Sequence, residues 1–334
     1  MSTPTSSRIV RFHETGDAEN LILEELPFAE PAQGEIGIRV EAIGLNRAEV
    51  MFRQGQYLET PEPPARLGYE AAGIVEKLGP GVSGFEIGER VSTIPGFSQN
   101  QYGVYGETAI VPAAAVAHYP DKLTPIEGTS IWMQYLTAYG GLIEVGKADA
   151  EKTLLITAAS SSVGLAAIQI AKMIGARCIA TTRGNDKKQF LLDAGADHVV
   201  VTDQEDLAKS VMTISDGRGV DIVFDPIGGP LLAQLADAAA AGGIIIEYGA
   251  LSPEPSPYPL FPALAKSLTI RGYVLFEITT VPSRLEKAKR FVYDGLESGA
   301  LKPIIDRSFT LDEIVQAHRY MESNRQQGKI VVTV

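Results

Sequence analysis

Cysteine is almost missing from this sequence, and its scarcity excludes whole classes of site. Cys178 is the only cysteine in 334 residues, so the chain can form no internal disulfide and no metal site built from several thiolates. No apolar run is long enough for a membrane-spanning helix, which needs about 18 residues or more. The opening residues MSTPTSSRIV lack the apolar centre of a secretion signal. We therefore expect a cytoplasmic protein with no membrane partner.

Positive charge is also scarce. The chain has 29 Lys and Arg residues against 41 Asp and Glu residues, which gives a formal net charge of −12. A surface of this average sign repels polyanions, and no basic or basic–aromatic run interrupts it. The charge balance argues against a nucleic-acid partner, so the partner we expect is a small-molecule substrate.

What the sequence does contain is two regions of different pattern. In residues 8–127, short alternating segments such as EIGIRVEAIGL and AAGIVEKLG are separated by Gly and Pro, which predicts a mostly antiparallel, barrel-like domain. We assign residues 1–127 to this domain. We expect residues 274–334, with helices from about Arg284 and Leu311 and the closing strand KIVVTV, to return to it and complete it.

Residues 128–273 alternate between strands and helices. Apolar segments at 153–157, 178–182, 198–201, 221–225, 243–249 and 268–273 predict strands, and the segments 163–175, 187–194, 205–213 and 231–241 predict helices. Almost continuously apolar strands separated by helices indicate a parallel sheet with both faces covered. The fold class is therefore α/β, with a doubly wound parallel-sheet domain in addition to the β-rich domain.

The turn after the first of these strands matches a dinucleotide-binding fingerprint only in part. Of the G-x-G-x-x-G pattern, the first two glycine positions carry Ala159 and Ser161, and only Gly164 is retained. Small residues still let backbone N–H groups approach a pyrophosphate, and serine hydroxyls can add hydrogen bonds. A turn that only caps the following helix explains the same residues, so the turn alone leaves both interpretations open.

The end of the second strand favours NADPH as the cofactor. Domains that bind NAD place an Asp or Glu there for the ribose 2′-hydroxyl, but this sequence has Thr182, followed by Arg183 and by Lys187 and Lys188. Basic side chains accept a 2′-phosphate that a carboxylate would repel. The two lysines would also suit an exposed helix, but a basic group on an otherwise acidic chain favours a binding role for Arg183 and Lys187.

Landmarks along the whole chain resemble the medium-chain dehydrogenase/reductase superfamily, and most closely its quinone oxidoreductases. They are GLNRAE at 44–49, RQGQY at 53–57, LGYEAAGIV at 67–75, VSGFEIGERV at 82–91, YGETAIVP at 105–112, AGADHVV at 194–200, DIVFDPIGG at 221–229 and GKIVV at 328–332. The resemblance extends from Arg8 to Val334. It implies a GroES-like β-barrel catalytic domain at 1–127 and a Rossmann NADP-binding domain at 128–273, with the cofactor in the cleft between them.

The resemblance also implies chemistry without zinc. At the positions where related alcohol dehydrogenases carry zinc ligands, this sequence has Asn46, Tyr69 and, near the last of them, Met133, none of which zinc prefers. By resemblance, Asn46 lies beside the nicotinamide ribose. Tyr57 is the first candidate to donate a proton to the substrate oxygen, and Tyr69 is the second. Packing in a core or interface is the alternative role for each tyrosine.

Other cofactor contacts follow from the same resemblance. Thr137 is expected at the nicotinamide amide, and Ser161, Ser162 and Val163 at the pyrophosphate. The remaining expected contacts are Thr202 near the adenosine, Tyr248 and Gly249 near the nicotinamide, and Asn324 in the tail. Relatives pair through the edge of the Rossmann sheet, and the apolar stretch GIIIEY at 243–248 with the strand near Thr269 predicts a homodimer.

Three functions remain open from the sequence. The first is an NADPH-dependent, zinc-independent oxidoreductase that reduces quinones or other activated carbonyl or alkene acceptors. The second is a 2-enoyl or acrylate-type reductase. The third, from another class, is a dinucleotide-binding protein without catalytic activity. The combination of Asn46, Tyr57 and the basic turn favours an enzyme.

Overall fold

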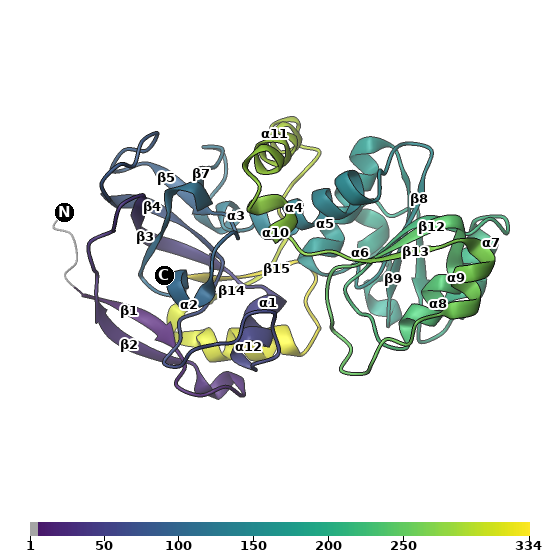
Figure 1. Ribbon diagram of the computed structural model, residues 1–334, viewed down its shortest axis with the longest axis horizontal. Coiled ribbons are helices and arrows are strands. Elements are labelled where there is room, and N and C mark those ends of the chain that lie inside the picture. Colours follow the sequence, from purple (N-terminus) through teal and green to yellow (C-terminus); the bar gives the residue numbers. More distant parts are fainter. Residues whose placement is uncertain (1–5) are drawn as a thin grey trace. The chain divides into compact units, whose positions relative to one another are not determined.

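The computed structural model describes residues 6–334, and the chain forms two compact units (Figure 1). The first unit contains the residues up to Met133 together with Pro303–Val334, and the second contains Gln134–Lys302. Among the described residues, none of the helices has the length and apolar character needed to cross a membrane.

Antiparallel pairing dominates the first unit. Its main sheet has the strand order β14-β15-β3-β4-β5-β7, with β6 also paired to β3, while β1 and β2 form a separate two-stranded sheet. The strands are β1 Ser6–Arg11, β2 Ile22–Pro27, β3 Glu35–Gly44, β4 Glu70–Leu78, β5 Arg90–Thr93, β6 Thr108–Pro112, β7 Val116–His118, β14 Ile305–Thr310 and β15 Lys329–Thr333. The helices are η1 Ala18–Asn20, α1 Arg47–Arg53, α2 Gln99–Tyr102, η2 Ala113–Ala115, α3 Pro125–Gly128, η5 Leu311–Glu313 and α12 Ile314–Glu322.

The register of three neighbouring strands brings distant parts of the sequence together. Val331 in β15 pairs with Gly44 in β3, and Gly44 also pairs with Glu70 in β4. The last strand of the chain therefore lies directly beside the end of β3, where α1 begins. Gly44 is required at this crossing, because a Cβ there would lie 2.3 Å from the carbonyl oxygen of Thr129.

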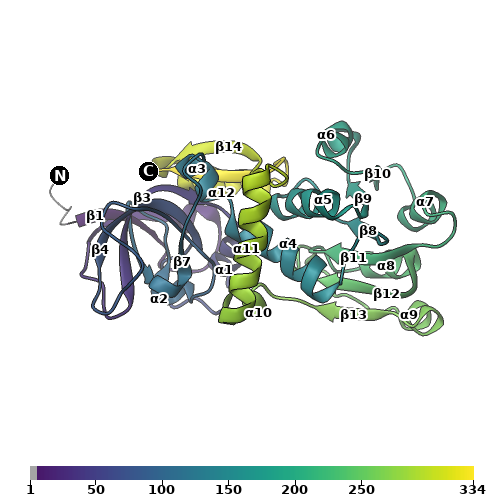
Figure 2. The same ribbon diagram turned by 90° about the horizontal axis from the view of Figure 1, so that it is seen from above.

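A parallel sheet forms the second unit, with the strand order β10-β9-β8-β11-β12-β13. The strands are β8 Thr153–Ile156, β9 Arg177–Thr182, β10 His198–Val201, β11 Val220–Asp225, β12 Ala239–Glu247 and β13 Thr269–Gly272. The helices are α4 Trp132–Tyr139, which begins at the boundary of the two units, η3 Gly140–Val145, α5 Ser162–Ile174, η4 Asn185–Lys187, α6 Lys188–Asp193, α7 Leu207–Ile214, α8 Leu231–Ala238, α9 Leu260–Lys266, α10 Phe276–Thr279 and α11 Pro282–Ser298. Figure 2 shows α5 and α6 on one side of the sheet and α8 and α9 on the other.

The buried face of this sheet explains why its strands are so apolar. Leu155, Val223 and Ile245 come from three neighbouring strands and pack with Leu207 and Leu235 of the helices, all at 0–1% exposure. The predicted parallel sheet covered on both faces is thereby confirmed.

One predicted helix boundary is wrong. The alanine-rich segment 231–241 was expected to be helical throughout, but α8 ends at Ala238 and Ala239 opens β12. Two contacts end the helix there. Nζ of Lys266 lies 3.0, 2.6 and 2.9 Å from the carbonyl oxygens of Ala236, Asp237 and Ala239, and Ala239 pairs with Val220 of β11. Alanine is a strong helix former, but intrinsic propensity is small beside tertiary contacts, which override it here.

The tail of the chain divides differently from our expectation. Residues 274–334 were expected to complete the first unit, but the return begins at Pro303, and α11 groups with the second unit. Contacts within that unit hold the helix: Nε of Arg284 lies 2.7 Å from Oε2 of Glu144, and the ring of Phe291 lies 5.0 Å from that of Tyr139.

Candidate functional site

Asn46 lies between the end of β3 and the start of α1 and belongs to a buried polar network. Its backbone N–H donates to Oε2 of Glu49 at 2.5 Å, and its side-chain Nδ2 lies 3.1 Å from Oε1 of the same residue. Nδ2 also lies 3.2 Å from the carbonyl oxygen of Gly44 and 3.2 Å from Oε2 of Glu70. Asn46 thus serves as the N-cap of α1, and its amide nitrogen has three acceptors for two hydrogens.

Lys329 supplies the positive charge of this network. Its Nζ forms an ion pair with Glu70 and donates to Oδ1 of Asn46 at 2.6 Å. The side chains of the pair are 0% and 1% exposed. Removing one partner of such a pair leaves an uncompensated charge in a medium of low dielectric constant, which typically destabilises a protein by about 3–5 kcal/mol.

The two glutamates of the network also hold the positions that carry zinc ligands in related alcohol dehydrogenases. The backbone N–H of Tyr69 donates to Oε1 of Glu49 at 3.3 Å, and that of Met133 donates to Oε1 of Glu70 at 2.8 Å. Asn46, Tyr69 and Met133 offer an amide, a phenol and a thioether, which do not fit zinc. Within residues 6–334, no group of three or more His, Cys, Asp or Glu side chains could hold a metal ion. Burial raises the pKa of Glu49 to about 8, although the charge of Lys329 opposes this shift.

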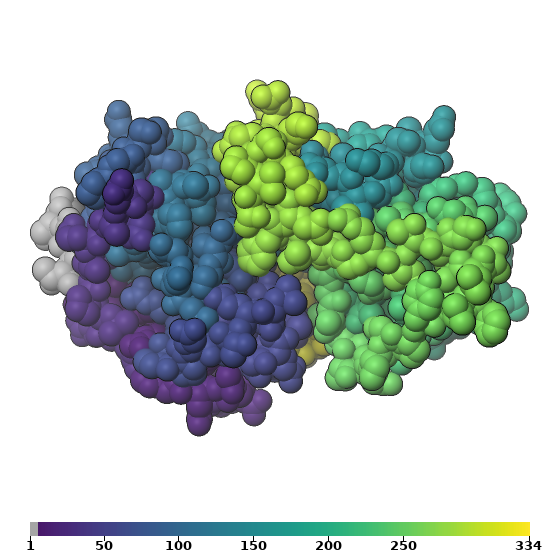
Figure 3. Space-filling model, in the orientation of Figure 1, coloured from purple at the N-terminus to yellow at the C-terminus, as the bar shows by residue number. Residues whose placement is uncertain are grey.

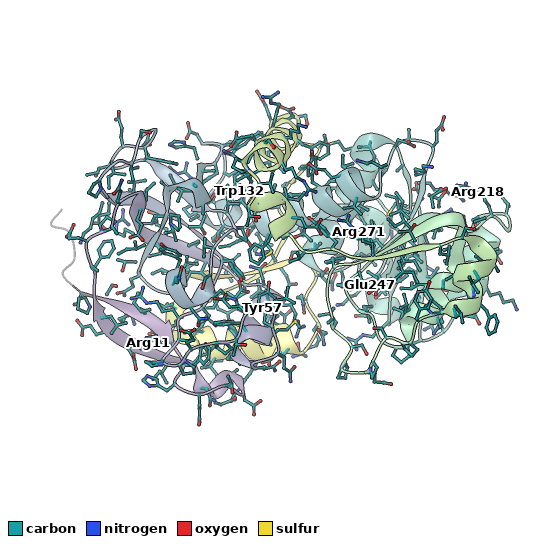
Figure 4. All side chains as sticks on the ribbon, in the orientation of Figure 1. Arg11, Tyr57, Trp132, Arg218, Glu247 and Arg271 are labelled. Carbon is teal, nitrogen blue, oxygen red and sulfur yellow. The ribbon has the colours of Figure 1, made fainter. Side chains whose placement is uncertain are left out.

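Tyr57 and Tyr69 form a pair of phenols after α1 (Tyr57 is labelled in Figure 4). Their ring centroids are 6.5 Å apart, with the ring planes inclined by 60°. Burial raises the pKa of Tyr57 to about 12 and raises that of Tyr69 further. Both phenols are therefore neutral hydrogen-bond donors at physiological pH. Tyr69 is only 1% exposed, whereas Tyr57 is half-buried, so Tyr57 is the one that a substrate can reach.

In the second unit, the turn before α5 has the close packing that a dinucleotide fingerprint provides. Oγ of Ser161 accepts a hydrogen bond from the backbone N–H of Gly164 at 3.1 Å and so caps α5. A Cβ on Gly164 would lie 2.6 Å from both Cα and the carbonyl oxygen of Ala159, so only glycine allows this approach. Ser162 and Val163 are half-buried in the first helical turn. The helix start can therefore present backbone N–H groups to an anion.

Basic side chains lie close to this turn. Nζ of Lys187 is 3.2 Å from Oγ of Ser160, and Arg183 is exposed at the end of β9. Oγ1 of Thr182 donates to the carbonyl oxygen of Gly184 at 3.3 Å. The carbonyl oxygen of Thr182 accepts from the backbone N–H of Thr202 at 2.9 Å. Lys187 thus lies against the turn before α5, and Thr202 lies against the end of β9.

A pair of carboxyl groups follows on the next two strands. Asp225 ends β11 and Glu247 ends β12, and the two residues are paired across these strands (Glu247 is labelled in Figure 4). Asp225 accepts hydrogen bonds from Thr157 and from the backbone N–H groups of Ile227 and Gly228, at 3.1 and 2.7 Å for the last two. Among the described residues, nothing hydrogen-bonds Oε1 of Glu247. Burial and the charge of Asp225 raise the pKa of Glu247 to about 8.

The remaining predicted contacts lie in varied settings. Tyr248 stacks on Phe224 with ring centroids 4.0 Å apart, and burial raises its pKa while Ser161 beside it acts in the opposite direction. Gly249 is exposed, Thr137 is buried in α4, and Asn324 is exposed after α12, where Arg47 donates to its side chain.

Sequence reasoning missed four polar residues of these sites: Glu49, Glu70, Glu247 and Lys329. Glu49 alone had a local signal, because Asn followed three residues later by Glu is the spacing of a capping box. The other three depend on strand register, which the sequence does not display.

Comparison with known proteins places this geometry in a family. Residues 32–121 match the alcohol dehydrogenase GroES-like domain, and residues 162–292 match the zinc-binding dehydrogenase family. The chain is 30% identical over 333 residues to a quinone oxidoreductase of Salmonella typhimurium, covering 96% of this chain and 97% of that protein. It is 29% identical over 327 residues to a 2-haloacrylate reductase of a Burkholderia species, covering 96% and 97%.

A solved structure agrees with these relatives. The crystal structure of Escherichia coli quinone oxidoreductase complexed with NADPH has a TM-score of 0.91 and 28% identity, and the match covers 98% of this chain and 100% of that one. Both units of this chain therefore have counterparts in a single solved structure.

The carboxyl pair predicts a pH-dependent stability. Because the pKa of Glu247 is about 8 in the folded chain and the ordinary pKa of a glutamate is 4.5, the folded protein holds a proton between these pH values that the unfolded chain has lost. Stability from this group is therefore complete below pH 4.5 and falls as the pH rises toward 8. In calorimetry from pH 5 to 9, the melting temperature of Glu247→Gln should rise relative to that of the wild type as the pH increases. The exposed control Glu254→Gln should show a constant difference, and a constant difference for Glu247→Gln would contradict the shift.

Proposed function

The chain belongs to the medium-chain dehydrogenase/reductase superfamily and resembles its quinone oxidoreductases, and from this premise we propose that it is an NADPH-dependent, zinc-independent reductase of quinones or other activated carbonyl or alkene acceptors. The observation that carries the proposal is the combination of two sites in one chain. One is a small-residue turn with basic side chains beside it, and the other is an Asn46–Tyr57 site without side chains that zinc prefers.

The residues of the second unit fit NADPH. Gly164 allows close approach to the start of α5, Ser161 and Ser162 offer hydroxyls, and Arg183 and Lys187 supply positive charge for the 2′-phosphate. When bound, NADPH supplies the hydride that reduces the acceptor. Thr202, Thr137, Tyr248, Gly249 and Asn324 complete the proposed set of cofactor contacts.

In the first unit, the chain must stabilise the negative charge that develops on the acceptor oxygen. Tyr57 is the proposed donor to that oxygen, because its phenol is neutral and half-buried. Tyr69 interacts with Tyr57 and restricts where it can lie. Asn46 orients the ribose of the cofactor. A pKa near 12 makes Tyr57 a hydrogen-bond donor rather than an efficient acid.

A second candidate is an acrylate-type or 2-enoyl reductase. The paired phenols favour it, since reduction of an enone or enoyl compound generates a basic enolate that benefits from a positioned donor. The alternative of a dinucleotide-binding protein without activity has no residue that favours it specifically.

Tyr57→Phe should separate the two acceptor classes. Losing the phenol should lower kcat/KM for an enone by about 10²–10³-fold, as for the loss of one hydrogen-bond donor to an oxyanion. It should change the rate with an electron-poor quinone far less, because the hydroquinone oxyanion is less basic. The measurement is the rate of NADPH oxidation. Adding a metal chelator to the same assay tests zinc independence, because the wild type should then keep its activity. NADPH affinity is the control. An equal rate for enones in variant and wild type would remove Tyr57 from this role, and no oxidation with any acceptor would reject the enzyme.

Arg183→Ala should weaken NADPH binding but not NADH binding. The exposed guanidinium can meet the 2′-phosphate only of NADPH, and one charge-assisted contact is worth about 1.5–3 kcal/mol. Titration of both cofactors into both proteins measures the difference. Lys209→Ala on α7 is a control that should change neither affinity. A preference of the wild type for NADH would reject the proposed cofactor.

A homodimer formed through the second unit is also proposed. β13 is the last strand of the parallel sheet, and beside it the segment with α9, green in Figure 3, lies on the surface of the unit. This segment exposes Tyr258 62%, Leu260 50%, Phe261 81% and Leu264 68%, an apolar group that a second copy would cover. Light scattering should give twice the chain mass of 35.7 kDa. Phe261→Asp should shift it toward the monomer, while Leu58→Asp, in the first unit, should not. A monomeric wild type at micromolar concentration would contradict this.

A further inference from the structure

The side-chain amide of Asn46 is held in one orientation by groups of opposite character. Its Oδ1 accepts from the ammonium of Lys329 at 2.6 Å. Its Nδ2 has only acceptors within reach among the described residues, on Gly44, Glu49 and Glu70, at 3.1–3.2 Å. A flipped amide would place NH₂ against an ammonium and its oxygen against two carboxyl groups. The buried charges therefore exclude the flip.

This orientation leaves one hydrogen-bonding valence open. Both hydrogens of Nδ2 are taken by the three protein acceptors, while Oδ1 has two lone pairs and Lys329 uses one of them. Asn46 is 7% exposed, so its side chain is not fully enclosed. Asn46 can therefore accept a hydrogen bond from a ligand hydroxyl but has no hydrogen left to donate.

We propose that Lys329 is a positioning residue for the cofactor: by holding Oδ1 of Asn46, it makes Asn46 a hydrogen-bond acceptor for a ribose hydroxyl of the dinucleotide. The proposal rests on the proposed function, since it takes the dinucleotide as the ligand. Lys329 acts through Asn46 and does not itself contact the cofactor.

A purely structural role for Lys329 makes a different prediction. In that case the ammonium only neutralises Glu70, and any change that restores the charge balance restores the protein. Glu70→Gln combined with Lys329→Met removes both charges of the pair, so it separates the two roles. Glu70→Gln alone is the matched control, because Lys329 remains to hold Oδ1 of Asn46.

The double variant should release the amide of Asn46 from its single orientation. The amide introduced by Glu70→Gln keeps its oxygen at the Oε1 position, where it accepts from the backbone N–H of Met133, at 2.8 Å in the present structure. Its NH₂ then takes the Oε2 position, facing Asn46, and attracts Oδ1. Without the ammonium, only Glu49 and the carbonyl oxygen of Gly44 still favour the original orientation. Asn46 is then no longer held in one orientation, and its flipped form presents a donor where the ribose hydroxyl needs an acceptor.

The experiment measures melting temperature, NADPH affinity and the affinity for 2′,5′-ADP, which lacks the nicotinamide ribose, in four proteins: wild type, Glu70→Gln, Lys329→Met and the double variant. Lys329→Met should melt earlier and lose NADPH affinity. The double variant, which has no unpaired charge, should melt above both single variants, yet bind NADPH about tenfold more weakly than the Glu70→Gln control, as expected for one lost hydrogen bond. All four should bind 2′,5′-ADP alike.

Two results would overturn the inference. Recovery of both stability and NADPH affinity in the double variant would leave Lys329 with charge neutralisation alone. A parallel loss of both in the double variant would also overturn the inference, because Lys329 would then be needed for the fold and not only for the orientation of Asn46. If Lys329→Met does not fold, the charge-balanced double variant still carries the test. If all four proteins bind NADPH with the same affinity, and likewise 2′,5′-ADP, the proposed function stands but the inference about Lys329 is wrong. If the wild type binds neither compound, the proposed function itself is rejected.

Discussion

The buried ion pair between Lys329 and Glu70 is the interaction on which the arrangement of the first unit depends. Both side chains are almost completely withdrawn from water, and an unpaired charge in such a place is strongly unfavourable. The pair can form only when β15, β3 and β4 lie in their observed register, with Gly44 opposite both Val331 and Glu70. The strand register therefore brings the two charges together, and the pairing of the charges in turn favours that register.

The surroundings of Asn46 follow from this pair. Once Lys329 and Glu70 are fixed, the amide of Asn46 can satisfy both only in one orientation. Glu49 then closes the N-terminus of α1 and holds the backbone of Tyr69, whose ring lies beside Tyr57. The phenols are thus positioned through a chain of contacts that begins at a single ammonium group.

The features that could be predicted from the sequence are those whose cause is local. Apolar strands separated by helices predicted the parallel sheet, and Ser161 with Gly164 predicted a capped helix with close backbone approach. Lys329 could not be predicted, because it lies 283 positions from Asn46 and only strand register joins them. Ala239 was assigned to a helix because alanine favours helices locally. What places it in a strand is its pairing with Val220, which the sequence does not show. The raised pKa of Glu247 could not be predicted either, because it depends partly on Asp225 of the neighbouring strand.

The buried carboxyl groups of the two units differ in the donors that surround them. Glu70 receives the ammonium of Lys329 and the N–H of Met133, and Asp225 receives three donors from its own turn and Thr157. Glu247 receives none on Oε1, and with a pKa of about 8 it keeps its proton at neutral pH. The charge of Asp225 contributes to this shift, so the two carboxyl groups at this edge oppose each other's ionisation. Since a phosphorylated dinucleotide is itself strongly negative, a neutral Glu247 beside Tyr248 removes a repulsion that an ionised carboxylate would add at the same edge.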